Sequence, residues 1–461
     1  MKYTTLLGAT LAGLAGLAAA PSGIAGEWSP SEVLATASSA SGTYLIYPYV
    51  DIDGQGNLVA AWNNENSPSG GATTYQAQAS SATFNGTWAT PVYLTSPGSL
   101  NADPVFSLKS SSVGLSTAVL SSSAGAVIVD HLVRGAWTPG VVVAPNISQL
   151  AANRAGDQML LGFTGTFGQH TNNTTTVTAK FRQGSGSWGP TETVGSGINA
   201  KLEVATLAPD NTAVVVWYTF HYVCARRCTT QDYVRHVSTR APGKAPWVDV
   251  GTLPTPLNGN PSTHPVMTFA ADAVGNQVFL VYGSSGGYAQ LIARRNGVWS
   301  APVTPVANPI NLSIRPVMYL DDAGNATIVL GQNPVPGNAQ VPGAASVGVI
   351  TGKIATNSWA PAQVVSGTDA TGLFAFAENA AGAAVIAYQS NWNTRLPYSI
   401  HAVTRATAGG AWSAPVNLDS TLGDYYFGGA AVNETGQAAV TYSGDDTALS
   451  FSTIRVVEYQ P

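Results

Sequence analysis

Four residues of this sequence have side chains that could do acid and base chemistry together. Tyr47, Asp103, His264 and Arg315 each stand directly before a proline, at widely separated places in the chain. A phenol, a carboxylate, an imidazole and a guanidinium can bind a polar ligand or, at the right distances, transfer protons. Their spacing forms no known catalytic motif, so the fold would have to bring them together.

Four further residues are candidates for ligand binding. Trp392 lies in a short polar segment, where its indole face could stack on a sugar ring or pack against a neighbouring loop. Lys201, Glu203 and Tyr425 stand at places comparable to those of the four residues above. We expect these four side chains to contact a ligand if the fold places them at one opening.

The two cysteines, Cys224 and Cys228, have His221 before them and His236 after them. These are residue types that bind zinc. In an exported protein, two cysteines this close more often form a disulfide within their own loop. We therefore expect a disulfide between them, with no metal ion and no other cofactor.

Composition narrows the classes of partner. Charged residues make up 9% of the chain and the net charge is −5, while 45% of residues are hydrophobic. Nucleic acids and anionic membranes attract basic surfaces, which this chain lacks. The composition favours a partner without strong charge, such as a neutral extracellular glycan or a protein surface. We expect the protein itself to be a monomer.

The first 25 residues have the features of an export signal. Lys2 precedes an apolar stretch from Leu6 to Ala20, and Gly23–Ala25 has the small residues of a cleavage site. No later apolar run reaches the roughly 18 residues that a membrane-spanning helix needs. The sequence thus predicts a signal peptide at 1–25 and one secreted domain at 26–461.

A repeat organises the predicted domain. A tryptophan followed by proline and an aliphatic residue recurs eight times, with the proline displaced at one copy, at Trp28, Trp88, Trp137, Trp188, Trp247, Trp299, Trp359 and Trp412. Neighbouring copies are between 49 and 60 residues apart, which is enough for one four-stranded sheet and its loops. The repeat therefore predicts a chain of similar units.

A second phrase lies between the tryptophans and also occurs eight times. It is a turn, usually with glycine, followed by a short apolar strand, as in Gly56–Trp62. Helical periodicity is absent, so we predict an all-β β-propeller of four-stranded blades, eight in number, or seven if one degenerate unit merges with its neighbour. The last unit lacks a Trp phrase, so we expect the strand around Trp28 to complete it and close the ring.

The two phrases together resemble the generic propeller repeats of secreted proteins, which are loosely grouped with sialidase-like propellers. The chain departs from sialidases because no copy has their Asp-box pattern and no arginine triad is identifiable. We therefore transfer no sialidase site to this chain.

Loop length indicates which face of the propeller is functional. The glycine turns are short, whereas five loops between second and third strands are long and varied, among them Asn63–Thr74 and Tyr218–Asp232. Variable loops on a rigid scaffold often bind ligands, although they can also be tolerated insertions. We predict a binding protein that recognises a neutral glycan or a protein at this loop-rich face.

The alternative function is a glycoside hydrolase or polysaccharide lyase. In a propeller the candidates around Asp103 and His264 would lie at the mouth of the central channel. Residues at such a mouth can also be polar simply because water fills the channel.

Overall fold

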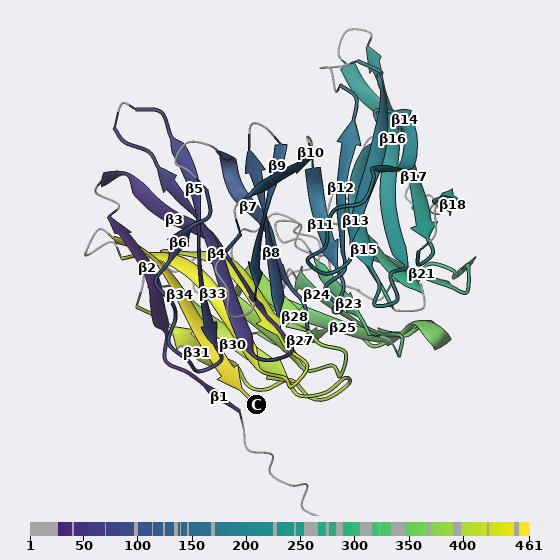
Figure 1. The fold of residues 1–461 in the computed structure, drawn as a ribbon. Coiled ribbons are helices and arrows are strands. Elements are labelled where there is room, and N and C mark those ends of the chain that lie inside the picture. Colours follow the sequence, from purple (N-terminus) through teal and green to yellow (C-terminus); the bar gives the residue numbers. More distant parts are fainter. Residues whose placement is uncertain are drawn as a thin grey trace, which may run out of the picture.

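In the computed structural model of the 461-residue chain, the secondary structure of the described residues is almost entirely antiparallel β-strand (Figure 1). It describes residues 26–38, 41–69, 71–95, 100–112, 114–122, 125–132, 137–138, 140–144, 147–166, 171–224, 228–243, 246–252, 266–272, 276–282, 289–304, 316–321, 323–332, 346–366, 370–390, 398–421, 424–446 and 451–461. Within these ranges no helix is long and apolar enough to span a membrane. The all-β prediction is confirmed.

The described residues form eight antiparallel sheets, six of four strands and two of five. The first four sheets, in chain order, are β3 (Thr43–Ile52), β4 (Asn57–Asn66), β5 (Thr74–Thr83) and β6 (Val92–Tyr93); β7 (Leu100–Ser110), β8 (Leu115–Ser122), β9 (Gly125–Leu132) and β10 (Val141–Ala144); β11 (Ile147–Ala152), β12 (Gln158–Thr164), β13 (Thr174–Arg182) and β14 (Glu192–Ile198); and β15 (Lys201–Leu207), β16 (Ala213–Cys224), β17 (Cys228–Arg240) and β18 (Val248–Thr252).

The other four sheets follow in the same way. They are β19 (Val266–Ala271), β20 (Gln277–Tyr282), β21 (Ala289–Arg295) and β22 (Val298–Trp299); β23 (Val317–Leu320), β24 (Asn325–Gln332), β25 (Ser346–Lys353), β26 (Ser358–Trp359) and β27 (Gln363–Val364), with the 3-10 helix η2 (Ile354–Thr356); β28 (Ala370–Glu378), β29 (Ala384–Ser390), β30 (Ser399–Arg405) and β31 (Val416–Asp419); and β32 (Asp424–Val432), β33 (Ala438–Asp446) and β34 (Phe451–Gln460) with β1 (Glu27–Trp28) and β2 (Glu32–Ser38).

The turn between first and second strands has the chemistry that its sequence predicts. In the first sheet, Oδ1 of Asp53 accepts hydrogen bonds from the backbone amides of Gln55 and Asn57, both at 2.8 Å. Gly56 has φ 82°, a conformation that glycine adopts without strain. Asp272 and Asp321 bind the equivalent amides in their own turns, so one turn design recurs around the molecule.

The core lies between sheets, because the second strand of each sheet is buried on both faces. Along β4, Leu58, Ala60 and Trp62 pack toward the last sheet. Val59 and Ala61 point the other way and pack toward the second sheet. The continuous apolar run of Gly56–Trp62 predicts a strand covered on both sides, and the structure confirms this prediction.

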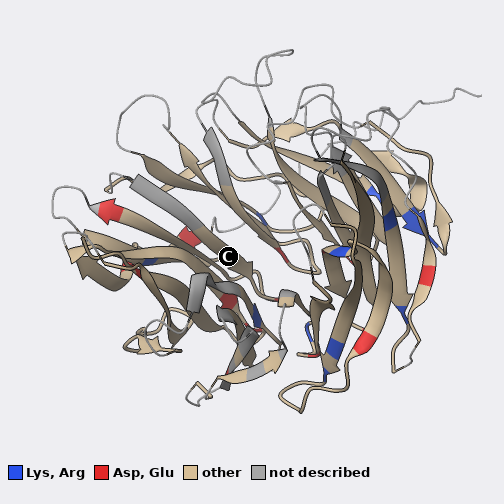
Figure 2. Ribbon diagram, turned by 90° about the horizontal axis from the view of Figure 1, so that it is seen from above, with Lys and Arg blue, Asp and Glu red and all other residues tan. Residues whose placement is uncertain are grey.

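Successive sheets pack against one another, and the last sheet packs against the first, so the sheets form a ring. The first strand of each sheet contacts that of the next, and β3 of the first sheet contacts β32 of the last. The sheets stand around a common centre when seen from above, with charged residues scattered among them (Figure 2). This arrangement is that of a β-propeller.

The N-terminal residues complete the last sheet, as predicted. Trp28 pairs with Tyr459 across β1 and β34, and their ring centroids lie 5.0 Å apart. β2 continues along β34, with Glu32 opposite Val456. The two chain ends thus share one sheet.

Two details of the strand prediction are wrong. The segment Tyr218–Asp232, expected to be a long loop, is mostly strand, because β16 and β17 extend to Cys224 and Cys228. This hairpin rises above its neighbours in Figure 1. The Trp phrase also predicts an outer strand from Trp88 to Leu94, but the structure limits this strand to Val92–Tyr93, because Pro91 lacks the amide that strand pairing needs.

Candidate functional site

The structure describes only some of the candidate residues from the sequence. Asp103 and Tyr425 have their backbones in β7 and β32, but their side chains lie outside the described part of the molecule. His264, Arg315 and Trp392 fall outside the described residues altogether. The predicted convergence at the channel mouth therefore stays a prediction.

Tyr47 is described, and its backbone is unusual. It has φ 50°, a left-handed conformation that is uncommon for residues other than glycine. It lies where β3 loses register with β4, and the following Pro48 packs against Gly428, where a Cβ atom would meet the proline carbonyl oxygen. The Tyr47 side chain is 43% exposed on the innermost strand, and nonstandard backbone of this kind often accompanies function.

Lys201 and Glu203 lie on one strand, β15, where both interact with other residues of the fourth sheet. The Glu203 carboxylate accepts a hydrogen bond from Nε of Arg235 at 2.8 Å in a mostly buried ion pair. The Lys201 ammonium lies 5.4 Å from the ring centroid of Phe220. Glu203 is thus neutralised within its own sheet.

The cysteines lie at the tip of the β16–β17 hairpin. Cys224 is directly opposite Cys228 in the register of the two strands. His236 stacks on Trp217, with ring centroids 4.1 Å apart, near the other end of the hairpin. Among the described residues, no group of three or more His, Cys, Asp or Glu side chains is placed to hold a metal ion.

The first cavity of interest, which we call the neutral cleft, lies between β2 of the last sheet and the face of the first sheet turned toward it. It has a volume of about 520 Å³. Its polar lining residues are Thr36, Ser38, Thr43, Asn64, Gln78 and Tyr93, and the remaining described ones are aliphatic residues and a proline. None of the described lining residues is charged.

The cleft lies at the loop-rich end of the two sheets. Thr43 pairs with Asn66, the last residue of β4 before the loop to β5. Gln78 is fixed by its carbonyl oxygen, which accepts a hydrogen bond from the buried indole of Trp62 at 2.9 Å. Tyr93 pairs with Gln78 across the strands and is 58% exposed. The Gln78 amide, which is held by its hydrogen bond to Trp62, and the exposed ring of Tyr93 therefore line the same wall of the cleft.

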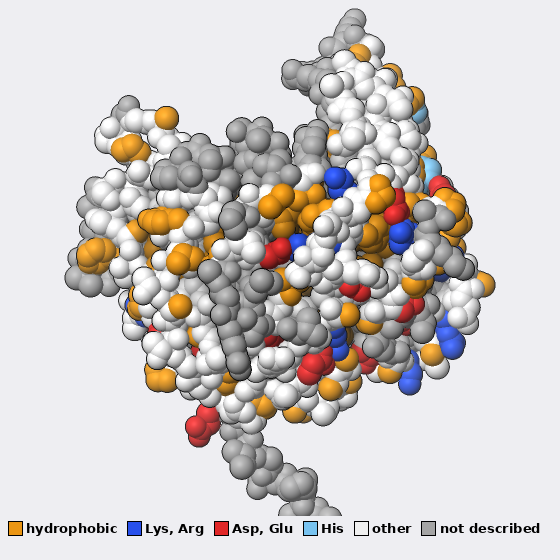
Figure 3. Space-filling view, viewed as in Figure 1, with side chains coloured by type: hydrophobic (Ala, Val, Ile, Leu, Met, Phe, Trp, Pro, Cys, Tyr) orange, Lys and Arg blue, Asp and Glu red, His pale blue; other side chains and the backbone are white. Residues whose placement is uncertain are grey.

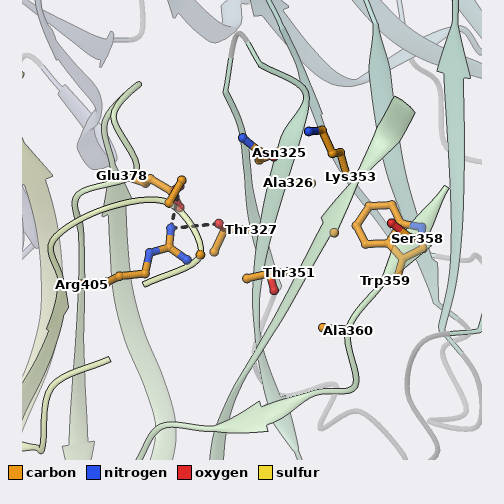
Figure 4. Close-up of a pocket in the computed structure, with 13 residues that line it drawn as sticks. Asn325, Ala326, Thr327, Thr351, Lys353, Ser358, Trp359, Ala360, Glu378 and Arg405 are labelled. Atoms are coloured by element: carbon orange, nitrogen blue, oxygen red, sulfur yellow. Dashed lines mark hydrogen bonds and ion pairs between the residues drawn. The ribbon is translucent and has the colours of Figure 1, made fainter. Parts of the chain in front are cut away.

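The second cavity, which we call the Glu378 pocket, lies between the sixth and seventh sheets at the end that carries the glycine turns. It has a volume of about 440 Å³. Figure 4 shows Glu378, Arg405 and Thr327 on one side and Lys353, Ser358 and Trp359 on the other. This pocket, unlike the neutral cleft, contains charge.

An ion pair dominates the Glu378 pocket. Nη2 of Arg405 lies 2.7 Å from Oε1 of Glu378, and both side chains are almost completely buried. The same nitrogen donates to the Thr327 hydroxyl at 3.1 Å. Among the described residues, Oε2 of Glu378 is buried and has no hydrogen-bond partner, and burial raises the pKa of this carboxyl to about 7.

A third feature crosses the middle of the molecule. Arg154, in the turn after β11, forms an ion pair of 2.9 Å with Glu434, in the turn after β32. These turns belong to the third and eighth sheets, which are not neighbours in the ring. The pair therefore spans the central channel at the glycine-turn end.

Sequence reasoning missed the Arg405 position, although a signal was present. An arginine lies at the end of the third strand, or one residue before it, and five to seven residues before the Trp of the phrase in four units, at Arg182, Arg240, Arg294 and Arg405. Three of these guanidinium groups lie over the Trp that follows, at 4.8, 5.8 and 5.0 Å for Arg182, Arg294 and Arg405. The cation is thus part of the repeat.

Comparisons with known proteins find similarity of structure alone. The sequence matches no protein-family model, and no curated protein is significantly similar to it. The chain is structurally similar to a protein of unknown function from Dyadobacter fermentans, with a TM-score of 0.41 and 11% identity over 94% of this chain and 99% of that one.

Two sialidase-type propellers are also similar. One is a variant of the NanB sialidase from Streptococcus pneumoniae, with a TM-score of 0.39 and 10% identity over 94% of this chain and 71% of that one. The other is the intramolecular trans-sialidase from Ruminococcus gnavus, with a TM-score of 0.35 and 9% identity over 92% and 95% of the two chains. No activity is transferred from them to this chain.

Proposed function

We propose that the protein is a secreted β-propeller that binds a neutral oligosaccharide in the neutral cleft. The observation that carries this proposal is the chemistry of the lining, in which hydroxyl and amide groups surround an exposed tyrosine and none of the described residues is charged. In Figure 3, charged side chains gather over the centre and right of the face, and few lie at the left, over β2 to β5. A charged ligand would lose its hydration there without gaining a counter-ion.

The polar groups of the cleft suit the hydroxyls of a sugar. The Asn64 amide and the Thr36 hydroxyl line the cleft, and neither side chain has a hydrogen-bond partner among the described residues. The nitrogen of the Gln78 amide is a donor that its bond to Trp62 leaves unused. The exposed ring of Tyr93 offers an apolar face for the C–H side of a pyranose.

The size of the cleft favours a glycan over a folded protein. Its volume lies within the range of about 300–1,000 Å³ that is usual for small-ligand sites. A stable protein interface buries about 800 Å² on each partner and is mostly flat. A concave cleft between two sheets suits a short chain of sugar units better.

The test is a binding screen of the purified mature protein on neutral and acidic glycans. Binding of a neutral glycan should weaken at least tenfold in Tyr93→Ala and in Asn64→Ala, which corresponds to about 1.4 kcal/mol. Val92→Ala is the matched control, since Val92 is exposed on the same strand but does not line the cleft. Exclusive binding of acidic glycans, or full affinity in both cleft variants, would refute the proposal.

We further propose that the ring has eight blades, that cleavage after Ala25 releases the domain, and that Cys224 is bonded to Cys228. The eight described sheets support the blade count, and the opposed cysteines support the pairing. Sequencing of the secreted product should start at Gly26. Reduction should add the mass of two hydrogen atoms, and an unchanged mass would exclude the disulfide.

A further inference from the structure

Two arginines, Arg182 and Arg405, occupy equivalent positions in the repeat. Each ends the third strand of its sheet and pairs with the residue two places after the turn glycine, which is Gln158 in one sheet and Ala384 in the other. Each also lies over the Trp of the following phrase. The surroundings of one arginine can therefore be compared with those of the other.

Arg182 has a carboxylate beside it from the preceding sheet. Asp130 on β9 receives hydrogen bonds from Nη1 at 2.7 Å and from Nη2 at 2.6 Å, in a two-pronged contact. Asp130 pairs with Thr117 across β8 and β9, and the Thr117 hydroxyl accepts from the same guanidinium at 2.9 Å. Two parallel hydrogen bonds to a carboxylate are the strongest arrangement available to arginine.

Arg405 lacks this carboxylate. Thr327 is the equivalent of Thr117 and binds Arg405 in the same way, but its cross-strand partner is Thr351. A threonine thus stands where the other interface has Asp130, and the Glu378 pocket opens beside it. Nη1 of Arg405 has no hydrogen-bond partner in the described part of the chain.

We infer that the Glu378 pocket binds a small molecule with a carboxylate group. The ligand's carboxylate would lie beside Arg405 in the same way as the Asp130 carboxylate lies beside Arg182. The rest of the pocket suits an anion with an organic body. Lys353 adds a second positive charge to the lining, and Trp359 adds an aromatic surface. Thr351 and Ser358 supply hydroxyl donors near the same space.

Glu378 competes with such a ligand for the charge of Arg405. The charged groups around its carboxyl are Arg405 from β30, Asp321 at the end of β23 and Lys353 across the pocket. When Glu378 takes up a proton, the charge of Arg405 becomes available to the ligand. Because burial raises the pKa of Glu378 to about 7, the ligand should bind best below neutral pH.

Above this pKa, the affinity should fall as pH rises. A ligand that binds only the protonated form loses about tenfold in affinity for each pH unit above the pKa. The neutral cleft has no charged lining residue among those described, so glycan binding there should lack this dependence.

The test is calorimetric titration of the full mature protein with sodium D-glucuronate, and with D-glucose as the uncharged match. We expect glucuronate to bind at pH 6 and to bind about tenfold more weakly at pH 8, while glucose leaves the pocket empty. Thr351→Asp should abolish glucuronate binding, because the new carboxylate would pair with Arg405 as Asp130 pairs with Arg182 and would occupy the ligand's place. Thr351→Ser should retain it, since the pocket stays open and uncharged on that side.

The inference is overturned if glucuronate does not bind at pH 6, if glucose binds in the pocket equally well, or if Thr351→Asp still binds glucuronate. A melting scan of Thr351→Asp shows whether that variant is folded, and the added pairing with Arg405 should raise its melting temperature. Tyr93→Ala should leave glucuronate binding unchanged. Failure at this pocket is therefore distinguishable from failure at the neutral cleft.

Discussion

Arg154 donates a hydrogen bond from Nη2 to the hydroxyl of Tyr319 at 2.8 Å, although the two residues belong to the third and sixth sheets. Its other terminal nitrogen binds Glu434 of the eighth sheet. One side chain therefore connects three sheets that are not neighbours in the ring, across the glycine-turn end of the central channel.

The Arg154 contact should matter little for stability, because it is partly exposed. Arg154→Ala should lower the free energy of unfolding by about 1 kcal/mol or less, as is usual for ion pairs at the surface. Arg182→Ala should cost about 3–5 kcal/mol, because it leaves Asp130 mostly buried and without its counter-ion. Urea denaturation of both variants measures the difference, and similar costs would contradict the role of burial.

Removal of the N-terminal strand should damage the last sheet. Deletion of residues 26–34 exposes the edge of β34 and removes Leu34 from the core, which should cost several kcal/mol of stability. Removal of the exposed terminal Pro461 is the control and should change stability by about 0.5 kcal/mol or less. A thermal midpoint that stays the same after the longer deletion would exclude closure of the ring by β1 and β2.

The sequence was sufficient to predict the ring because its signals are local. The glycine at position 56 and the carboxylate at 53 belong to one turn, and the missing Trp phrase of the last unit pointed to Trp28. The Glu378 pocket could not be predicted in this way. Its proposed ligand depends on Thr351 standing where the second sheet has Asp130, and only the strand pairing identifies these two positions as equivalent.

Contacts between residues that are far apart in the chain could not be predicted from the sequence either. Arg154 and Glu434 are far apart in the chain, and both lie in turns that look alike in every unit. Likewise, Tyr93 follows the Trp phrase as an ordinary strand residue, and its place in a cleft depends on β2 arriving from the other end of the chain. The direction of side chains and the packing between sheets determine which residues meet at these contacts and in the cleft.

Glu378 should make the protein less stable as pH rises toward neutrality. Burial raises the pKa of its carboxyl from 4.5 to about 7 in the folded state, so the folded chain holds a proton that the unfolded chain has already released between these two values. The free energy of unfolding should therefore fall by about 3 kcal/mol from pH 4.5 to 7 through this group, and stay level above pH 7. Denaturation at several pH values measures this slope.

The matched variant for this slope is Glu378→Gln. A glutamine of the same shape cannot ionise, so the part of the slope that comes from Glu378 should vanish. Unchanged pH dependence in Glu378→Gln would assign the slope to other groups.

Tyr47 should be dispensable for folding in spite of its place on an inner strand. Its φ of 50° is strained for a tyrosine and easy for glycine. In Tyr47→Gly the relief of about 1 kcal/mol is offset by the greater freedom of glycine in the unfolded chain, so stability should change by about 0.5 kcal/mol or less. The control is Tyr49→Gly, which removes a ring packed against the core between the first and second sheets and should cost about 3 kcal/mol. If Tyr47→Gly lowers stability as much as Tyr49→Gly, the phenol has a structural role. The strained backbone then gives no reason to seek a function for Tyr47 at the mouth of the central channel.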